Sequence, residues 1–132
     1  MRGYRNEGRL CQRVYCRVYT KPNFRGKREV LRQGKHSFSE KFKGPGITNH
    51  KVVGENKIRA FTCSNHAFVK MNRNDFDSKS QDAFSFVGPA RTRKMTGEWD
   101  ITKKPNGIST IEIKCCPWRN CKFVTLFERA RF

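Results

Sequence analysis

The stretch VYTKPNFRGKREVL, residues 18–31, decides the fold of this chain. It places two aromatic residues and a glycine, Tyr19, Phe24 and Gly26, at the mouth of a hairpin between two strand-like runs. A hairpin that folds back over its own sheet needs a cover, and the two aromatic rings can pack across it. Gly26 can then take a positive φ, which a residue with a Cβ enters only at a cost. The spacing therefore predicts a folded hairpin, and the motif is structural in the first place.

The remainder of the chain reads as short strands joined by turns, without helical periodicity. The run RVYCRVYT alternates Val and Cys with Tyr and Arg, as a half-buried strand does. The other strand candidates are REVLRQG, NKIRAFTC, HAFVKMN, DAFSFVG, ISTIEIK and CKFVTLFE. Long polar loops are expected at residues 41–55 and 90–107. Short strands at regular spacing predict an all-β fold, an antiparallel sandwich or barrel.

The second half of the chain repeats the hairpin spacing in weaker form. Met71, four residues, Phe76, one residue and Ser78 precede the closing strand NGISTIEI. Methionine is a flexible apolar filler that can cover the same surface as a ring. A serine at a positive-φ position is either strained or relaxes the turn, so we expect the second hairpin to be looser. Two offset copies of this pattern make two Greek keys.

These motifs, VYTKPNFRGKREVL through NKIRAF and then NGISTIEI, resemble the Greek keys of a βγ-crystallin domain. The resemblance covers roughly residues 13–114, and it is strong in the first motif and degraded in the second. It implies a βγ-crystallin-like β-sandwich in a single domain, 1–132. The C-terminal extension, residues 115–132, is expected to add a strand over Cys121–Phe127 and to be held by its cysteines.

The same resemblance raises the question of calcium. Many βγ-crystallins bind calcium through two Asn or Asp, two variable residues, Ser or Thr, and Ser. The first half offers VVGENK, with neither the amides nor the hydroxyls, and the second offers PNGIST, with Asn106, Ser109 and Thr110 but an initial Pro105. Calcium prefers six to eight oxygen ligands that include carboxylates. We therefore expect no high-affinity calcium site, no other metal and no cofactor; weak binding at Asn106 and Ser109 stays open.

The net charge of +18 comes from 29 Lys and Arg against 11 Asp and Glu. An excess of this size bears on partners and not on fold. It implies an acidic counterpart, such as an anionic membrane, a cell wall, a sulfated glycan, a nucleic acid or an acidic protein.

An even number of cysteines in a small basic chain predicts three disulfides and an oxidising compartment. Six cysteines allow 15 pairings, and bridges between the N-terminal and C-terminal groups would tie both ends to the domain. Zinc is the alternative, although two adjacent cysteines fit a tetrahedral site poorly. The first ten residues lack the apolar run of a signal peptide, so a secreted protein would be represented here in its mature form. The cysteines are Cys11, Cys16, Cys63, Cys115, Cys116 and Cys121.

The sequence lacks the common catalytic motifs, including the P-loop, H-E-x-x-H and G-x-S-x-G. We therefore expect no enzyme and no small-molecule substrate. His36, His50 and His66 leave one alternative, an acid-base pair with a lysine as in small basic ribonucleases. Histidines in loops are more often solvated surface groups, which disfavours that alternative.

Basic residues gather in loops and tails, with aromatic residues among them. Positive charge beside Trp suits an anionic interface or stacking on single-stranded nucleic acid. Together with the resemblance, which includes killer toxins, antifungal proteins and a metalloproteinase inhibitor, this predicts a secreted, monomeric, antimicrobial or toxin-like protein that binds an anionic surface. The candidate binding residues are Arg91, Arg93, Lys94, Trp99, Lys103, Lys104 and Arg129.

Two other functions remain open from the sequence. The first is an extracellular protein-interaction module, either a protease inhibitor or a receptor or gamete-surface ligand. The second is nucleic-acid binding, which the cysteine content disfavours inside cells. Salt separates them, because polyanion binding weakens steeply with salt whereas a fitted protein complex persists.

Overall fold

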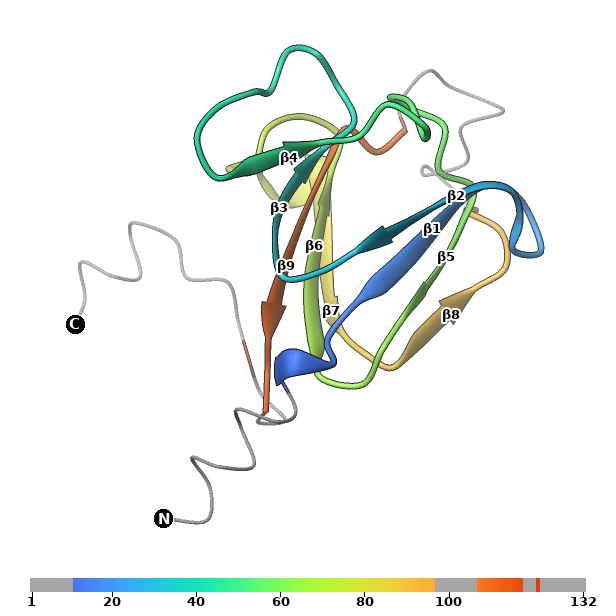
Figure 1. Cartoon of the computed structure of the whole chain (residues 1–132), viewed down its shortest axis with the longest axis vertical. Coiled ribbons are helices and arrows are strands. Elements are labelled where there is room, and N and C mark those ends of the chain that lie inside the picture. Colours follow the sequence, from blue (N-terminus) through green and yellow to red (C-terminus); the bar gives the residue numbers. More distant parts are fainter. Residues whose placement is uncertain (1–10, 97–106, 118–120, 122–132) are drawn as a thin grey trace.

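The computed structural model describes residues 11–96, 107–117 and 121. These form two β-sheets, a short 3-10 helix and a helical turn at residues 11–12 (Figure 1). The all-β prediction is therefore confirmed. Within this described part of the chain, no helix is long and apolar enough to cross a membrane. The elements are β1 (Cys16–Lys21), β2 (Arg25–Leu31), β3 (Gly34–Ser37), β4 (Ile47–Asn49), β5 (Ala60–Cys63), β6 (Ala67–Asn72), η1 (Ser80–Asp82), β7 (Ala83–Val87), β8 (Ala90–Thr92) and β9 (Thr110–Cys115).

The strand order interlocks the two halves of the sandwich. The first sheet runs β2-β1-β5-β8, and the second runs β4-β3-β9-β6-β7. Each half contributes to the other half's sheet: β3, with β4 at its edge, lies beside β9, and β8 lies beside β5. Two Greek keys that exchange strands in this way share one core, so neither half can bury its apolar face alone.

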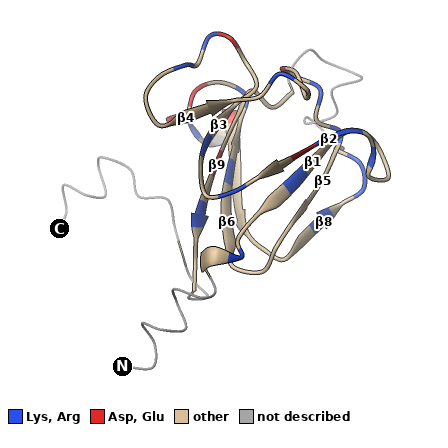
Figure 2. Ribbon diagram, viewed as in Figure 1, with Lys and Arg blue, Asp and Glu red and all other residues tan. Residues whose placement is uncertain are grey.

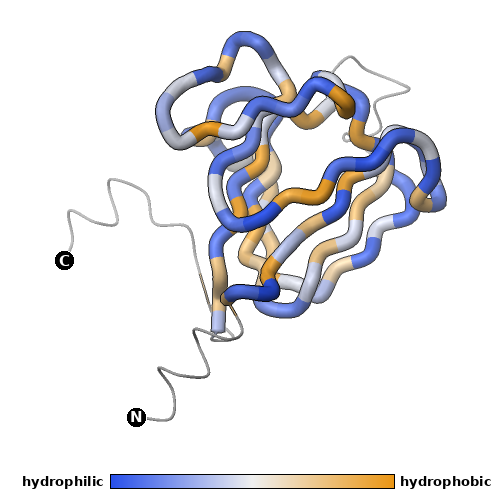
Figure 3. The backbone as a smooth tube through the Cα atoms, viewed as in Figure 1, coloured by the Kyte–Doolittle hydropathy of each residue, from blue (hydrophilic) through white to orange (hydrophobic). Residues whose placement is uncertain are grey.

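The core lies between the two sheets and is built mainly from aliphatic side chains. The tube in Figure 3 shows hydrophobic and hydrophilic positions interleaved along the strands, as expected for sheets with one buried face. The largest fully buried apolar side chains are Leu31, Ile58, Met71, Ile108, Ile111, Ile113, Val14, Val18, Val53 and Val69.

The first hairpin has the predicted cover. The rings of Tyr19 and Phe24 meet edge to face with centroids 5.6 Å apart. Gly26 has a φ of +81°, and a Cβ there would overlap the Thr20 hydroxyl and lie 2.9 Å from Cγ of Lys21. The Thr20 hydroxyl accepts a hydrogen bond from the backbone N–H of Lys27 at 2.8 Å, which closes the turn.

The second hairpin corrects the sequence alignment by one residue. Tyr19 pairs with Ala60 at the start of β5, and Asn72 pairs with Thr110 at the start of β9. Asn72 therefore occupies the place of Tyr19, and Met71 takes the place of the buried Val18. The alignment of Met71 with Tyr19 was wrong because the second hairpin is two residues longer: Tyr19 pairs with Arg28, whereas Asn72 pairs with Ala83.

The turn of the second hairpin is relaxed and not strained. Four described non-glycine residues have a positive φ, and Ser78 is not one of them. Its backbone N–H donates to the carbonyl of Asp75 at 3.1 Å, and its hydroxyl donates to the same oxygen at 2.6 Å. We expected Ser78 either to be strained at a positive φ or to relax the turn, and the turn is relaxed.

Two strands lie in segments that the sequence predicted to be loops. Ile47–Asn49 pairs in parallel with β3, and Ala90–Thr92 pairs with β5. Each has three residues, too few for alternation to appear. The predicted strand over Cys121–Phe127 lies almost wholly outside the described residues.

All six cysteines form disulfides, as predicted. Cys11 pairs with Cys115, Cys16 with Cys63, and Cys116 with Cys121. The first bridge joins the N-terminal and C-terminal groups across a sequence separation of 104 residues, and the second joins the adjacent strands β1 and β5. Zinc binding by these cysteines is excluded, because every sulfur is in a disulfide.

Candidate functional site

Three of the seven candidate binding residues lie in the described structure. Arg91 is in β8 at the edge of the first sheet, and Arg93 and Lys94 follow it; all three are exposed. The carbonyl of Arg93 accepts a hydrogen bond from the N–H of Asn23 at 2.8 Å, which joins this segment to the first hairpin. The other four residues, Trp99, Lys103, Lys104 and Arg129, lie outside the described residues.

The register of the first sheet aligns Arg91 with a second arginine. In β1, Cys16 and Val18 are buried, so Arg17 between them points to the other side of the strand. Arg17 pairs with Thr62 of β5, and Thr62 pairs with Arg91 of β8. Paired residues share a face, so these side chains form one row across the sheet. We call the side that carries them the outer face of the first sheet, which consists of Tyr15, Arg17, Tyr19, Arg28, Val30, Arg32, Thr62 and Arg91, with Phe24 folded onto it.

Aromatic rings lie against the guanidinium groups of this face. The Arg91 Cζ atom is 4.6 Å from the centroid of Phe24, whose ring also contacts Tyr19. The Cζ atoms of Arg17 and Arg32 lie 5.0 Å and 5.4 Å from the centroid of Tyr15. Each cation–π contact at an exposed site stabilises the arrangement by about 0.5–1 kcal/mol. The rings therefore hold the guanidinium groups on the outer face.

Acidic residues are nearly absent from these strands. Figure 2 shows Lys and Arg on β1 and β8 and around the β1–β2 turn. The four described strands of the first sheet hold one acid, Glu29, which pairs with the buried Val18 and so points to the inner side. Its carboxylate lies 3.4 Å from Nδ1 of His50. The basic residues of these strands are Arg17, Lys21, Arg25, Lys27, Arg28 and Arg91.

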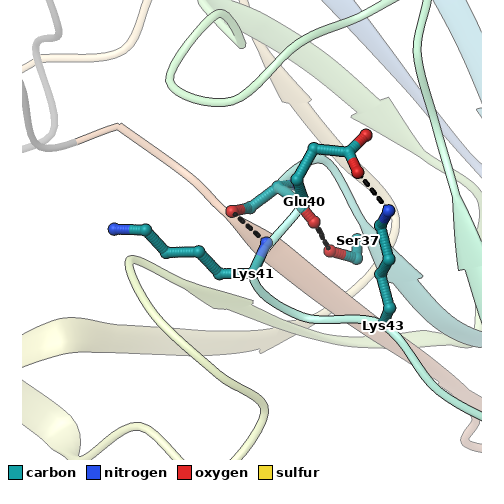
Figure 4. Close-up of polar contacts among 5 residues, drawn as sticks. Ser37, Glu40, Lys41 and Lys43 are labelled. Atoms are coloured by element: carbon teal, nitrogen blue, oxygen red, sulfur yellow. Dashed lines mark hydrogen bonds and ion pairs between the residues drawn. The ribbon is translucent and has the colours of Figure 1, made fainter.

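The basic loop after β3 differs, because its charge is partly neutralised. Figure 4 shows Glu40 paired with Lys43. The hydrogen bond from Lys43 lowers the pKa of the fully exposed Glu40. The loop is also fixed by hydrogen bonds: the Ser37 hydroxyl donates to the carbonyl of Ser39 at 2.9 Å, and the N–H of Lys41 donates to the Ser39 hydroxyl at 3.2 Å. Here a carboxylate competes for the lysine, unlike on the outer face of the first sheet.

The buried His36 contacts the partly buried His50, so the expectation of solvated loop groups was wrong for these two histidines. Nε2 of His36 lies 2.6 Å from the carbonyl of Arg32, and its Nδ1 lies 2.9 Å from Nε2 of His50. A carbonyl only accepts, so Nε2 of His36 carries the hydrogen and Nδ1 accepts from His50. Burial lowers the pKa of His36, and its bond to Arg32 opposes this in part. His36 is 5% exposed, which leaves little access for a substrate.

A polar pocket lies where the two Greek keys meet. It is lined by Glu55, Asn56, Arg73, Asn74, Asp82, Gly107 and Ser109. The Ser109 hydroxyl donates to Glu55 at 3.1 Å. Arg73 is held by two neighbours: its Nη1 donates to the carbonyl of Gln81 at 3.2 Å and lies 3.8 Å from the Asp82 carboxylate.

Comparison with known proteins identifies the architecture. The N-terminal domain of protein S has a TM-score of 0.56 at 17% identity, with 79% of this chain and 99% of that domain covered. A βγ-crystallin domain from Flavobacterium johnsoniae has a TM-score of 0.56 at 13% identity, covering 79% and 98%. A βγ-crystallin domain from Clostridium beijerinckii has a TM-score of 0.52 at 12% identity, covering 75% and 95%. The chain has the βγ-crystallin fold. No protein-family model matches the sequence, and no curated protein matches it.

The βγ-crystallin fold corrects the register assumed for the calcium signature. The N–H of Arg59 donates to the carbonyl of Tyr19, and the N–H of Ser109 donates to the carbonyl of Asn72. Arg59 is therefore the counterpart of Ser109, so the segment equivalent to PNGIST is ENKIRA, residues 55–60, and not VVGENK. The first half does retain an acid and an amide, Glu55 and Asn56, but it has Arg in place of the first hydroxyl.

Two features of the pocket disfavour calcium. Some of its oxygen atoms already have hydrogen-bond partners: the Ser109 hydroxyl donates to Glu55, and the Asn74 carbonyl accepts from the Thr110 hydroxyl at 2.6 Å. The guanidinium of Arg73 lines the same pocket beside the carboxylates of Glu55 and Asp82, and its positive charge opposes a cation there. Among the described residues, no group of three or more His, Cys, Asp or Glu is arranged to hold a metal ion.

Sequence reasoning missed the arginines of the outer face other than Arg91. Arg17, Arg28 and Arg32 lie in or beside strands, whereas the search for binding residues favoured loops. The signal was present in RVYCRVYT, where the alternation separates Arg17 and its neighbouring tyrosines from the buried positions. Phe24 showed no such signal, because its contact with Arg91 joins residues far apart in the sequence.

Proposed function

We propose that this βγ-crystallin-like chain is a secreted, non-enzymatic protein that binds an anionic surface, such as a membrane, cell wall or glycan, in an antimicrobial or toxin-like role. One observation carries the proposal: the outer face of the first sheet presents arginines while the only acid of its four described strands points inward. A one-sided cationic surface on a chain of net charge +18 attracts polyanions over a range of about a Debye length.

Two further features support this function. The three disulfides are compatible with an extracellular location, where thiols oxidise and bridges persist. His36 is buried, and it and His50 are hydrogen-bonded within the fold, which disfavours the acid-base pair that an alternative ribonuclease activity would require.

The proposal is tested by measuring binding to heparin, to anionic vesicles and to RNA in parallel, from 50 to 200 mM salt. We expect binding at low salt and a linear fall of log K with log salt; for six or more neutralised anions the loss is on the order of a thousandfold or greater. Neutral dextran and zwitterionic vesicles are the controls, and neither should bind.

Absence of binding to every polyanion at low salt would refute the proposal. A tight one-to-one complex with an extracellular protein that survives high salt would favour an interaction module instead. RNA degradation by the purified protein would show an enzyme.

A further inference from the structure

We infer that the outer face of the first sheet is the binding site and that its ligand is a sulfated glycan chain. The inference rests on the proposed function and deepens it, because it assigns both the surface and the class of polyanion. Three features support this assignment: the cations are arginines, aromatic rings lie against them, and the strand surface is flat.

The cations with aromatic partners on this face are arginines. Arg17, Arg32 and Arg91 each lie against a ring, and the exposed Arg28 pairs with Tyr19 in the neighbouring strand. A guanidinium is planar and can give two parallel hydrogen bonds to one oxyanion, whereas a lysine acts as a point charge. Groups held on rings lose less freedom on binding, so this face suits sulfate groups more than diffuse negative charge.

The aromatic rings are already occupied, which disfavours single-stranded nucleic acid. Recognition of single strands depends on bases that stack on aromatic side chains. Here Tyr15 has Arg17 and Arg32 against it, and Phe24 has Arg91 and Tyr19. A base that stacks on one of these rings would compete with a guanidinium, whereas a sulfate group can accept hydrogen bonds from the guanidinium N–H groups and leave the ring contacts in place.

The outer face offers a membrane few apolar anchors. Interfacial binding combines charge with large apolar side chains that enter the bilayer boundary. Among the described residues, the exposed large hydrophobic residues are Val30 and Val52. Val30 pairs with Arg17 and so lies on the outer face, but it is a small aliphatic residue within β2 and is flanked by arginines.

The shape of the site favours a chain over a small anion. Arg17 and Arg91 lie two strands apart, which is about 10 Å at the usual strand spacing. A flat strand surface cannot surround one anion, but it can contact successive anionic groups of a polymer. Arg28 and Arg32 extend the cationic area along and beyond β2.

The test compares three variants, which distinguish loss of the binding site from loss of net positive charge. The first is Arg17→Gln, Arg28→Gln and Arg91→Gln. The second is the control Lys41→Gln, Lys51→Gln and Lys57→Gln, which removes the same charge from three exposed loop residues. The third is Arg17→Lys, Arg28→Lys and Arg91→Lys, which keeps the charge but removes the guanidinium groups. The probes are heparin, desulfated heparin, a single-stranded oligonucleotide and phosphatidylserine vesicles.

We expect the glutamine variant of the outer face to weaken heparin binding by roughly tenfold or more, and the control by less than about threefold. The lysine variant should fall between them. Wild type should bind heparin much more tightly than desulfated heparin and more tightly than the oligonucleotide or the vesicles. Because Arg17 is half buried, the double variant Arg28→Gln and Arg91→Gln repeats the test with exposed residues alone, and melting temperatures confirm that each variant is folded.

The possible failures are distinguishable. Equal losses in the face and control variants would overturn the inference and leave the proposed function standing, as would equal binding of desulfated heparin. Selective loss of oligonucleotide or vesicle binding would assign the face to those ligands and also overturn it. If wild type binds none of the probes, both the inference and the proposed function fail.

Discussion

At the scale of single residues, Arg73 decides the behaviour of the pocket between the Greek keys. Its guanidinium lies beside the Asp82 carboxylate and the carbonyl of Gln81. The positive charge of this guanidinium opposes a divalent cation in the pocket. A cation would also have to compete with Arg73 for the Asp82 carboxylate.

We therefore expect calcium not to stabilise the protein. A ligand that binds the folded state raises the melting temperature by mass action. If calcium does not bind, the melting temperature in about 1 mM calcium should equal that in excess chelator. Differential scanning calorimetry provides the measurement, and magnesium at the same concentration controls for ionic strength. A rise of several degrees that is specific to calcium would contradict the reading of the pocket.

Asn72 shows why a residue-level alignment could fail while the fold was predicted correctly. Tyr19, Phe24 and Gly26 predict the first hairpin because large rings that cover a turn and a residue that tolerates a positive φ are few in kind. All three have the predicted geometry. Asn72 stands in the place of Tyr19 but is fully buried, and its side-chain amide has no hydrogen-bond partner among the residues that the structure describes. Nothing in the sequence identifies such an asparagine, whereas the Met71 spacing imitates the motif one residue out of register.

At the scale of elements, strands within apolar or alternating runs were predictable, and three short strands without such a run were not. Strands β1, β2, β5, β6, β7 and β9 coincide with apolar or alternating runs in the sequence. Strands β4 and β8 have three residues each, and β3 has four; their pairing depends on neighbours that are distant in the chain. The outer-face site was predictable only in part, because it combines Arg91 of such an edge strand with residues of β1 and β2.

Strand β3 carries the buried titratable residue His36. His36 faces His50, Glu29 and the Arg32 carbonyl, and burial lowers its pKa from the usual 6.5. Below pH 6.5 the unfolded chain therefore binds more protons at this residue than the folded chain. Its contribution is fully present above pH 6.5 and is lost as the pH falls through the lowered pKa.

We expect the free energy of unfolding to decrease from pH 7 to pH 5 with a component from His36, at most about 1.4 kcal/mol per pH unit for one proton. Urea unfolding of wild type and of His36→Asn measures this component as a difference in slope, which is independent of the variant's absolute stability. His66→Gln is the matched control and should keep the wild-type slope. An unchanged slope in His36→Asn would assign the acid sensitivity to other groups.

At the scale of the whole molecule, the disulfides oppose the self-repulsion of a chain with net charge +18. In the chain-entropy account, a bridge stabilises the fold by restricting the unfolded chain, and the effect increases with the length of the closed loop. Cys11 and Cys115 are 104 residues apart, and Cys116 and Cys121 are five apart. The two adjacent cysteines therefore close loops of very different length: Cys115 closes a long loop with Cys11, and Cys116 closes a short loop with Cys121.

This difference predicts the order of stability of two paired variants. Replacing Cys11 and Cys115 by serine should lower the free energy of unfolding by about 4–5 kcal/mol, and replacing Cys116 and Cys121 by about 2 kcal/mol. Urea unfolding without reductant measures both, and added salt should recover more stability in the first variant because it screens the repulsion between the freed ends. If both variants lose the same stability, loop length does not govern these bridges, and local packing around the sulfurs must account for their contribution.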